Sequence, residues 1–194
     1  MRDRRMEIIH AGLDVLREFG SSGFAQQRVA ARAGLRQSHL TYYYPTRVDL
    51  LAAVARAAID AQLAAVDAVF TTSSVDAGAT AIAKVVVRHE NTRVLMALAE
   101  SADREPSLRE LFRELAEGIV ARAGRFLKSL NPAANEVDAR MLHTLSVGLA
   151  IVDLATGRAD GQRQAAAILK AALLNITKGA GAKAPAIPQT GEKT

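Results

Sequence analysis

The apolar residues of the N-terminal segment recur every three or four positions, as they do along one face of an α-helix. This spacing predicts a helix from about Asp3 to Phe19, and Gly20 and Gly23 follow it as residues that end helices. The predicted apolar face consists of Met6, Ile9, Leu13 and Leu16.

Two shorter apolar segments lie on either side of Gly34. The first is predicted to start after Phe24 with Ala25 as its N-cap, and the second to begin near Arg36. Gly34 can adopt a positive φ, which permits a tight turn, and the small residues of the first helix let the second cross it closely at a steep angle. This arrangement predicts a helix-turn-helix, a motif that reads DNA. The apolar anchors are Val29, Ala30 and Ala33 in the first segment, and Leu35 and Leu40 in the second.

A long fourth helix is predicted to follow. Thr46 and Asp49 have the spacing of a capping box, and Pro45 ends the preceding helix. The apolar pattern continues to about Phe70, which corresponds to about 37 Å of helix. This is the only predicted element long enough to begin in the N-terminal region and end deep in the rest of the chain. We therefore expect it to transmit displacements between the two.

The remaining residues predict five more helices and no strand. These helices run from Ser73 to about Arg88, from Asn91 to about Asp103, from Pro106 to Asn131, from Asn135 to about Thr156, and from Asp160 to about Lys178. The tail at 179–194 has no apolar periodicity and is predicted to be disordered. The predicted fold is all-α, with a three-helix head at residues 1–46 and a helical body at 47–178.

Positive charge is concentrated in the head. Residues 1–47 contain eight arginines and four acidic residues, a net of +4 in a chain whose total is +5. Between Phe19 and Val48 there are four arginines and no carboxylate. A basic head on a near-neutral body is typical of proteins that bind nucleic acids, because arginines pair with phosphates.

The sequence offers little support for catalysis. It contains no cysteine, which excludes disulfides, thiolate metal sites and cysteine nucleophiles. No acid–base or nucleophile pair can be assigned, and the four histidines are far apart, so no enzyme activity, metal or cofactor is predicted. The chain lacks a charge-free apolar run of membrane-spanning length and an apolar signal-peptide core, so we expect a cytoplasmic protein without a membrane partner.

The stretch AxRAGLxxSxLTYYYPTRxDLL at residues 30–51 resembles the signature of the TetR (tetracycline-repressor) family of bacterial transcriptional regulators. The strong resemblance covers about residues 6–54. It implies a homodimer that binds a palindromic operator in double-stranded DNA, usually as a repressor, and that a small-molecule effector releases. Two other classes stay open at this stage. One is a helical small-molecule enzyme, and the other is a helical interaction or small-molecule-binding protein that does not bind DNA.

The candidate DNA contacts lie in the second and third helices. Arg36 caps its helix poorly because its charge opposes the positive end of the helix dipole, and such violations tend to occur at functional sites. The resemblance implies phosphate contacts for Tyr43 and Arg47, and a shorter reach for Thr41, where the family usually has tyrosine. The full predicted set is Gln26, Gln27, Arg28, Arg36, Gln37, Ser38, Thr41, Tyr42, Tyr43 and Arg47.

The helix predicted at 136–156 is apolar almost all round in its second half, so it must be covered on several sides. The TetR family dimerises by packing two such C-terminal helices against their mates in a four-helix bundle, and the resemblance implies the same assembly here. Burial inside a single chain is the alternative. The predicted dimer interface consists of Val147, Ile151, Leu154, Ile168, Leu169, Ala172 and Leu173.

The far half of the fourth helix, and the stripes expected to face it, carry aliphatic, aromatic and thioether groups with almost no charge. This composition suits a mainly apolar effector in a cavity of a few hundred Å³, with a polar group such as His89 to orient it. The alternative is that these side chains simply fill the core. The predicted ligand-binding residues are Leu63, Val66, Phe70, His89, Met96 and Phe112.

Overall fold

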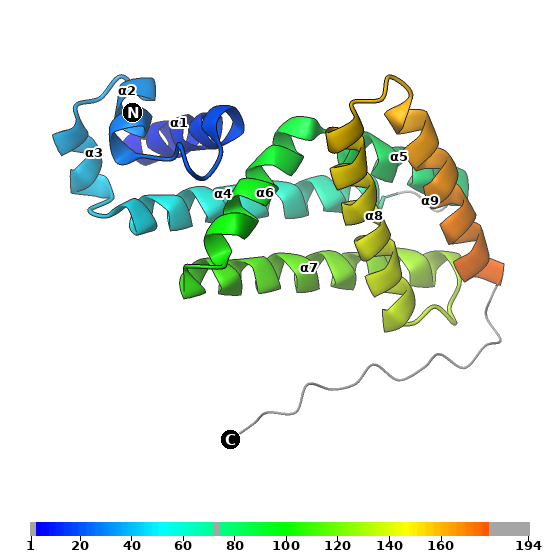
Figure 1. Cartoon of the computed structure of the whole chain (residues 1–194). Coiled ribbons are helices and arrows are strands. Elements are labelled where there is room, and N and C mark those ends of the chain that lie inside the picture. Colours follow the sequence, from blue (N-terminus) through cyan, green and yellow to red (C-terminus); the bar gives the residue numbers. More distant parts are fainter. Residues whose placement is uncertain (1–2, 72–73, 179–194) are drawn as a thin grey trace.

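The computed structural model describes residues 3–71 and 74–178, and within these ranges the chain forms nine α-helices and no strand (Figure 1). The helices are α1 (Arg4–Phe19), α2 (Gln26–Arg32), α3 (Gln37–Tyr43), α4 (Arg47–Val69), α5 (Val75–Val86), α6 (His89–Ala102), α7 (Pro106–Leu130), α8 (Glu136–Thr156) and α9 (Gly161–Lys178). The all-α prediction is confirmed. The tail predicted to be disordered, and Ser73, lie outside the described residues.

Capping boxes start two of the long helices where the sequence predicts them. At α4 the Thr46 hydroxyl accepts from the backbone N–H of Asp49, and the Asp49 carboxylate accepts in return from the backbone N–H of Thr46. Asn135 and Asp138 make the same reciprocal pair at α8. Each box satisfies backbone donors that the first turn of a helix leaves unpaired.

Two predicted starts differ from the structure. Helix α6 begins at His89 instead of Asn91, because the carbonyl of Arg88 already accepts the first helical bonds. Helix α5 is capped by Ser74, whose hydroxyl accepts from the backbone N–H of Ala77 at 3.2 Å. Both shifts are within one turn of helix, where local signals are least decisive.

The buried apolar side chains form two clusters. The first joins α1, α2 and α3 to the beginning of α4, the end of α6 and the beginning of α7, and its fully buried members include Ile8, Leu40, Leu50, Leu98 and Leu108. The second joins the end of α4 to α5, α7, α8 and α9, and includes Val69, Phe126, Leu127, Leu169 and Leu173. The head therefore shares its core with residues that follow it in the chain.

Helices α4 and α6 both reach from the head into the body (Figure 1). Helix α4 contributes Leu50 to the first cluster and Val69 to the second. Helix α6 lies across it and packs Val94 and Leu98 into the first cluster. The expectation that α4 is the only connecting element is thus incomplete, because α6 makes the same connection by crossing the body instead of running along it.

Candidate functional site

The turn between α2 and α3 has helix-turn-helix geometry. Gly34 adopts a φ of 66°, and the backbone N–H of Leu35 donates to the carbonyl of Ala30 at 2.9 Å. Val29 on α2 and Leu40 on α3 are fully buried and hold the two helices against the head's core. Neither α2 nor α3 has a side-chain cap, as expected from the sequence.

Two arginines of the head are occupied by contacts within the chain. Arg28 donates to the carbonyl of Gly23, and its guanidinium lies 4.5 Å from the centre of the Phe19 ring. Arg32 forms an ion pair with Glu18. The hydrogen bond to the Glu18 carboxylate holds the pKa of Arg32 above its ordinary value.

Arg47 braces the loop between α1 and α2. Its Nε donates to the carbonyl of Phe24 at 2.9 Å, and its Nη2 donates to the carbonyl of Ser21 at 3.2 Å. The Ser21 hydroxyl in turn donates to the carboxylate of Glu100 on α6. A polar path therefore connects α6, the α1–α2 loop and the N-terminus of α4.

Two other members of the predicted DNA-binding set bond to nearby carbonyls. Gln26 Nε2 donates to the carbonyl of Tyr44 at 2.8 Å. The Thr41 hydroxyl donates to the carbonyl of Ser38 at 3.1 Å. The Gln26 bond holds α2 against the end of α3, whereas the Thr41 bond lies within α3. Both leave the side-chain oxygen able to accept a further hydrogen bond.

Helix α3 presents an exposed polar edge at its N-terminus. The side chain of Arg36 is exposed and has no hydrogen-bond or ion-pair partner in the described part of the chain. Tyr42 is 82% exposed, and its ring meets that of half-buried Tyr43 edge-on, with 5.2 Å between centroids. The sequence prediction omitted His39, which is exposed on the same edge. The other exposed members of the predicted set are Gln27, Arg28, Gln37, Ser38 and Arg47.

A cavity of about 320 Å³ lies in the body, with walls from α4, α5, α6, α7 and α8. Four of the six predicted ligand residues line it: Val66, Phe70, Met96 and Phe112. Leu63 does not, because it faces α7, where a Cβ on Gly118 would lie 3.0 Å from Leu63 Cδ2. His89 does not line the cavity either.

His89 is instead held by Asp153 near the end of α8. Its Nε2 lies 2.7 Å from Asp153 Oδ2, and the Asp153 side chain is 9% exposed. The other carboxylate oxygen faces the first residue of α9, since a Cβ on Gly161 would fall 1.7 Å from Oδ1. The predicted ligand-orienting role of His89 is therefore corrected: this histidine fastens the start of α6 to α8.

The histidine that lines the cavity is His143 on α8. Burial lowers its pKa below the ordinary value of 6.5, and the positive charge of Arg140 lowers it further. Sequence reasoning missed His143, although it precedes Val147 and Ile151 by four and eight residues and so belongs to the same helical stripe. The other polar groups on the wall are Gln62, Asn91, Thr92 and Ser146.

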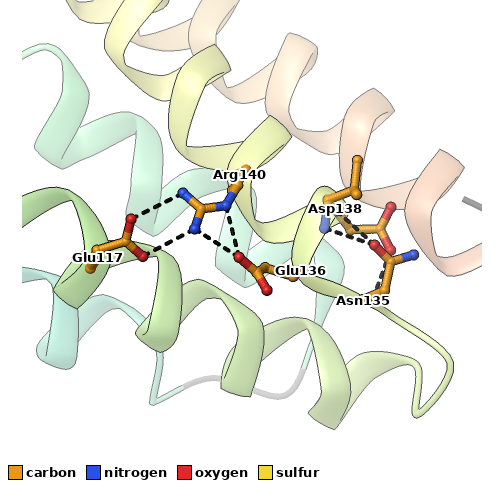
Figure 2. A network of polar contacts seen from close by, with 6 residues as sticks. Glu117, Asn135, Glu136, Asp138 and Arg140 are labelled. Atoms are coloured by element: carbon orange, nitrogen blue, oxygen red, sulfur yellow. Dashed lines mark hydrogen bonds and ion pairs between the residues drawn. The ribbon is translucent and has the colours of Figure 1, made fainter. Parts of the chain in front are cut away.

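Arg140 on α8 bonds to Glu117 on α7 and to Glu136 on its own helix (Figure 2). Its Nη1 and Nη2 donate to the two carboxylate oxygens of Glu117 at 3.2 and 3.1 Å, a bidentate pair. Its Nε and Nη2 donate to Glu136, one turn earlier on α8, at 2.9 and 2.7 Å. Hydrogen bonds to these two carboxylates raise the pKa of Arg140, whose side chain does not line the cavity.

Helices α8 and α9 expose a group of large apolar side chains, which we call the α8–α9 patch. Its members are Met141, Val147, Ile151, Val152 and Ile168, each between 42% and 57% exposed. Three of the predicted interface residues, Val147, Ile151 and Ile168, belong to it. Leu169 and Leu173 are corrected, because both are fully buried within the chain on the α9 face that packs against α5. Leu154 and Ala172 are half-buried.

Among the described helices, α8 is long and apolar enough to cross a membrane by length and composition, although only 17% of the relevant window is buried. Length and composition alone are weak grounds for a membrane span. Helix α8 also carries Arg140 and Asp153, whose partners lie on neighbouring helices.

Known proteins share parts of this sequence. The family model described as the C-terminal domain of tetracyclin repressor-like proteins matches residues 73–175. The HTH-type transcriptional regulator RutR of Escherichia coli (strain K12) is 34% identical over 61 residues, which cover 31% of this chain and only 29% of RutR.

Two solved structures extend the comparison over most of the chain. A transcriptional regulator from Rhodococcus sp. Rha1 has the same fold, with a TM-score of 0.80 and 23% identity over 90% of this chain and 96% of that one. The multidrug binding protein EbrR, solved in complex with imidazole, has a TM-score of 0.67 and 26% identity over 89% of this chain and 96% of that one.

The family model covers more than half of the sequence, and the solved relatives repeat the arrangement of a helix-turn-helix head on a helical body. Regulators of this kind are transcription factors, not enzymes. This chain belongs to the tetracycline-repressor-like (TetR) family of transcriptional regulators.

Proposed function

We propose that the protein is a homodimeric, cytoplasmic repressor. It binds a palindromic DNA operator through the heads of both protomers, and a small, mainly apolar ligand in the cavity releases it. One observation carries this proposal: the cavity and the head share two helices, because α4 and α6 line the cavity and also contribute to the core of the head. A ligand that binds more tightly to the conformation with one spacing of the two heads shifts the population toward that conformation.

The coupling runs through specific contacts. Met96 on α6 lines the cavity, and Glu100 one turn later accepts the hydrogen bond from Ser21 in the head. Arg47 holds the carbonyl of Ser21 and sits at the first position of α4. A displacement of α6 by a ligand therefore acts on the loop that positions α2 and on the N-terminus of α4 together.

We assign the DNA contacts to the predicted set in the head, residues 1–46, together with Arg47. Arg36 leads this set, because its charged side chain is exposed and free of partners within the described residues. The match to RutR, an HTH-type transcriptional regulator, supports DNA binding, although it spans less than a third of that protein. The complex of EbrR with imidazole supports the binding of a small molecule.

We assign the dimer interface to the α8–α9 patch. Five large side chains on two adjacent helices, all at least 42% exposed, make an apolar surface that water solvates poorly. A second copy of the chain can bury this surface with its own α8–α9 patch, and the two protomers are then related by two-fold symmetry. The same two-fold axis brings two heads to the two halves of a palindrome.

DNA binding is tested by fluorescence anisotropy with duplexes from the regions that flank the gene. We expect specific binding by the wild type, with an affinity that falls steeply as salt rises. The logarithm of the binding constant should fall by about 0.9 per phosphate neutralised for each tenfold rise in salt concentration. Arg36→Ala should weaken binding by about tenfold or more, as for the loss of a good contact to a base or phosphate. Arg163→Ala is the matched control, because that side chain is 84% exposed on α9 and its loss changes the net charge equally. Equal binding by the two variants, or no specific binding by the wild type, would refute the proposed role.

Assembly is tested by analytical ultracentrifugation. Val152→Glu should give monomers, because Val152 is 57% exposed in the α8–α9 patch and does not line the cavity. Met6→Glu is the matched control: Met6 is 42% exposed on α1, outside the patch, and its replacement should leave the dimer intact. A Val152→Glu protein that remains a dimer would place the interface elsewhere.

A further inference from the structure

The walls of the cavity carry no charged side chain. The lining residues from all five helices include no aspartate, glutamate, lysine or arginine, and most of them are aliphatic or aromatic. Arg140 on α8 lies outside the lining, and its guanidinium is paired with Glu117 and Glu136. A charged ligand would lose its hydration in this cavity and gain no counter-charge, so charge on the ligand is strongly disfavoured.

Three polar side chains on the wall are free to bind a ligand. Gln62 on α4, Asn91 on α6 and His143 on α8 have no hydrogen-bond partner among the described residues. The hydroxyl of Ser146 donates to the carbonyl of Leu142 at 2.8 Å, so only its oxygen lone pairs remain. The polar atoms of Gln62, Asn91 and His143 stay accessible, so a ligand that enters the cavity can form hydrogen bonds with them in place of water.

The donors and acceptors of these three side chains determine which ligand group they bind best. Each carboxamide of Gln62 and Asn91 has two donor hydrogens and one acceptor oxygen, and a neutral imidazole has one donor and one acceptor nitrogen. Burial keeps the ring of His143 neutral at neutral pH. A ligand group that both donates and accepts, such as an amide, a lactam or a phenol, satisfies such a set, whereas a permanent cation cannot accept.

We infer that the cavity binds an uncharged ligand with an apolar ring system and one group that both donates and accepts hydrogen bonds, oriented by Gln62, Asn91 and His143, and that it rejects organic cations. This inference rests on the proposed role of the cavity as the effector site. A volume of about 320 Å³ is at the lower end of the range for drug-sized ligands, which fits a molecule of two or three fused rings.

Two fluorescent probes of the same size test the inference. Acridone is an uncharged three-ring molecule with one N–H and one C=O, and proflavin is a three-ring cation in neutral water. The chain contains no tryptophan, so the emission of either dye is read without interference from indole. In titrations of the full chain we expect acridone to bind at least about tenfold more tightly than proflavin.

A single isosteric substitution should change this preference. Asn91→Asp keeps the shape of the side chain and adds one negative charge to the wall. The variant should fold, because the third position of α6 favours an acidic residue near the positive end of the helix dipole. We expect the ratio of the two affinities to move at least about tenfold toward proflavin. Asn175→Asp adds the same charge at an exposed position of α9 and should leave the ratio unchanged.

Three results would overturn the inference: proflavin binding to the wild type as tightly as acridone, no binding of either probe, or an unchanged ratio in Asn91→Asp. Operator affinity measured in parallel keeps the two proposals apart. If acridone binds as expected without altering operator binding, the ligand class stands and the effector role fails. If another compound releases the operator while acridone does not bind, the effector role stands and the inferred class is wrong.

Discussion

The pair of His89 and Asp153 should be one of the most costly polar contacts in the body to remove. Asp153 is almost fully buried, its Oδ2 lies 2.7 Å from the ring nitrogen of His89, and its Oδ1 faces the first residue of α9. A hydrogen bond to a charged group contributes about 1.5–3 kcal/mol to folding, and a carboxylate at a helix N-terminus about 0.3–1 kcal/mol. Because the His89 side chain is 34% exposed, we take the lower half of the range for a hydrogen bond to a charged group.

We therefore expect Asp153→Ala to lower the free energy of unfolding by about 2–3 kcal/mol, and His89→Ala by about 1–2 kcal/mol. For a chain of this size each kcal/mol lowers the melting temperature by roughly 2–4 °C. Urea unfolding followed by circular dichroism gives the free energies directly. Asp60→Ala is the control, since Asp60 is exposed on α4 and substitutions at such surface positions usually change stability by less than about 0.5 kcal/mol.

The double variant decides whether the two residues interact. If they do, the combined loss should be smaller than the sum of the single losses by about 1 kcal/mol or more, because the contact is lost only once. Additive losses would show that the two residues stabilise the body independently. His89 would then not stabilise the body through its contact with Asp153.

Three further outcomes are expected. Gly78→Ala should destabilise the fold by about 1–3 kcal/mol in urea unfolding, because the new Cβ would lie 2.5 Å from the stacked ring of Phe126. Gly124→Ala, where a Cβ has room, should stabilise the fold by up to about 1 kcal/mol. The folded-state pKa of His143 lies below 6.5, so as the pH falls the unfolded chain binds a proton at this residue before the folded chain does. Thermal unfolding between about pH 7 and about pH 5 should therefore show a larger loss of stability for the wild type than for His143→Gln. Glu100→Gln, which weakens the link from α6 to the head, should reduce several-fold the change in operator affinity that acridone causes while preserving operator binding itself, as read by anisotropy.

Local signals predicted most helices because the physics at their ends is local. Thr46 with Asp49 satisfies nearby backbone donors whatever the rest of the chain does, so the start of α4 could be read from four residues. The same is true of Gly34, whose positive φ closes the turn between α2 and α3. The helix-turn-helix and its apolar anchors could be predicted for that reason.

The errors arose where an outcome depends on how helices are rotated against each other. His89 and His143 both lie on helices that border the cavity, but only the packing of α6 against α8 decides which of them lines it. Leu169 and Leu173 belong to an apolar stripe that suits a dimer interface equally well. They are buried because that stripe meets α5, a long-range contact that spacing along α9 does not encode.

The sharing of one core between the head and later helices has a consequence for folding cooperativity. A fragment that ends at residue 46 would lack Leu50, Leu51 and Val54, all fully buried against the head, and also the α6 side chains that cover α1. Such a fragment should not fold alone, and transplanting the head onto another protein requires the chain as far as Leu108. Helix α4 enters both clusters without a break, so the full chain should unfold in a single transition.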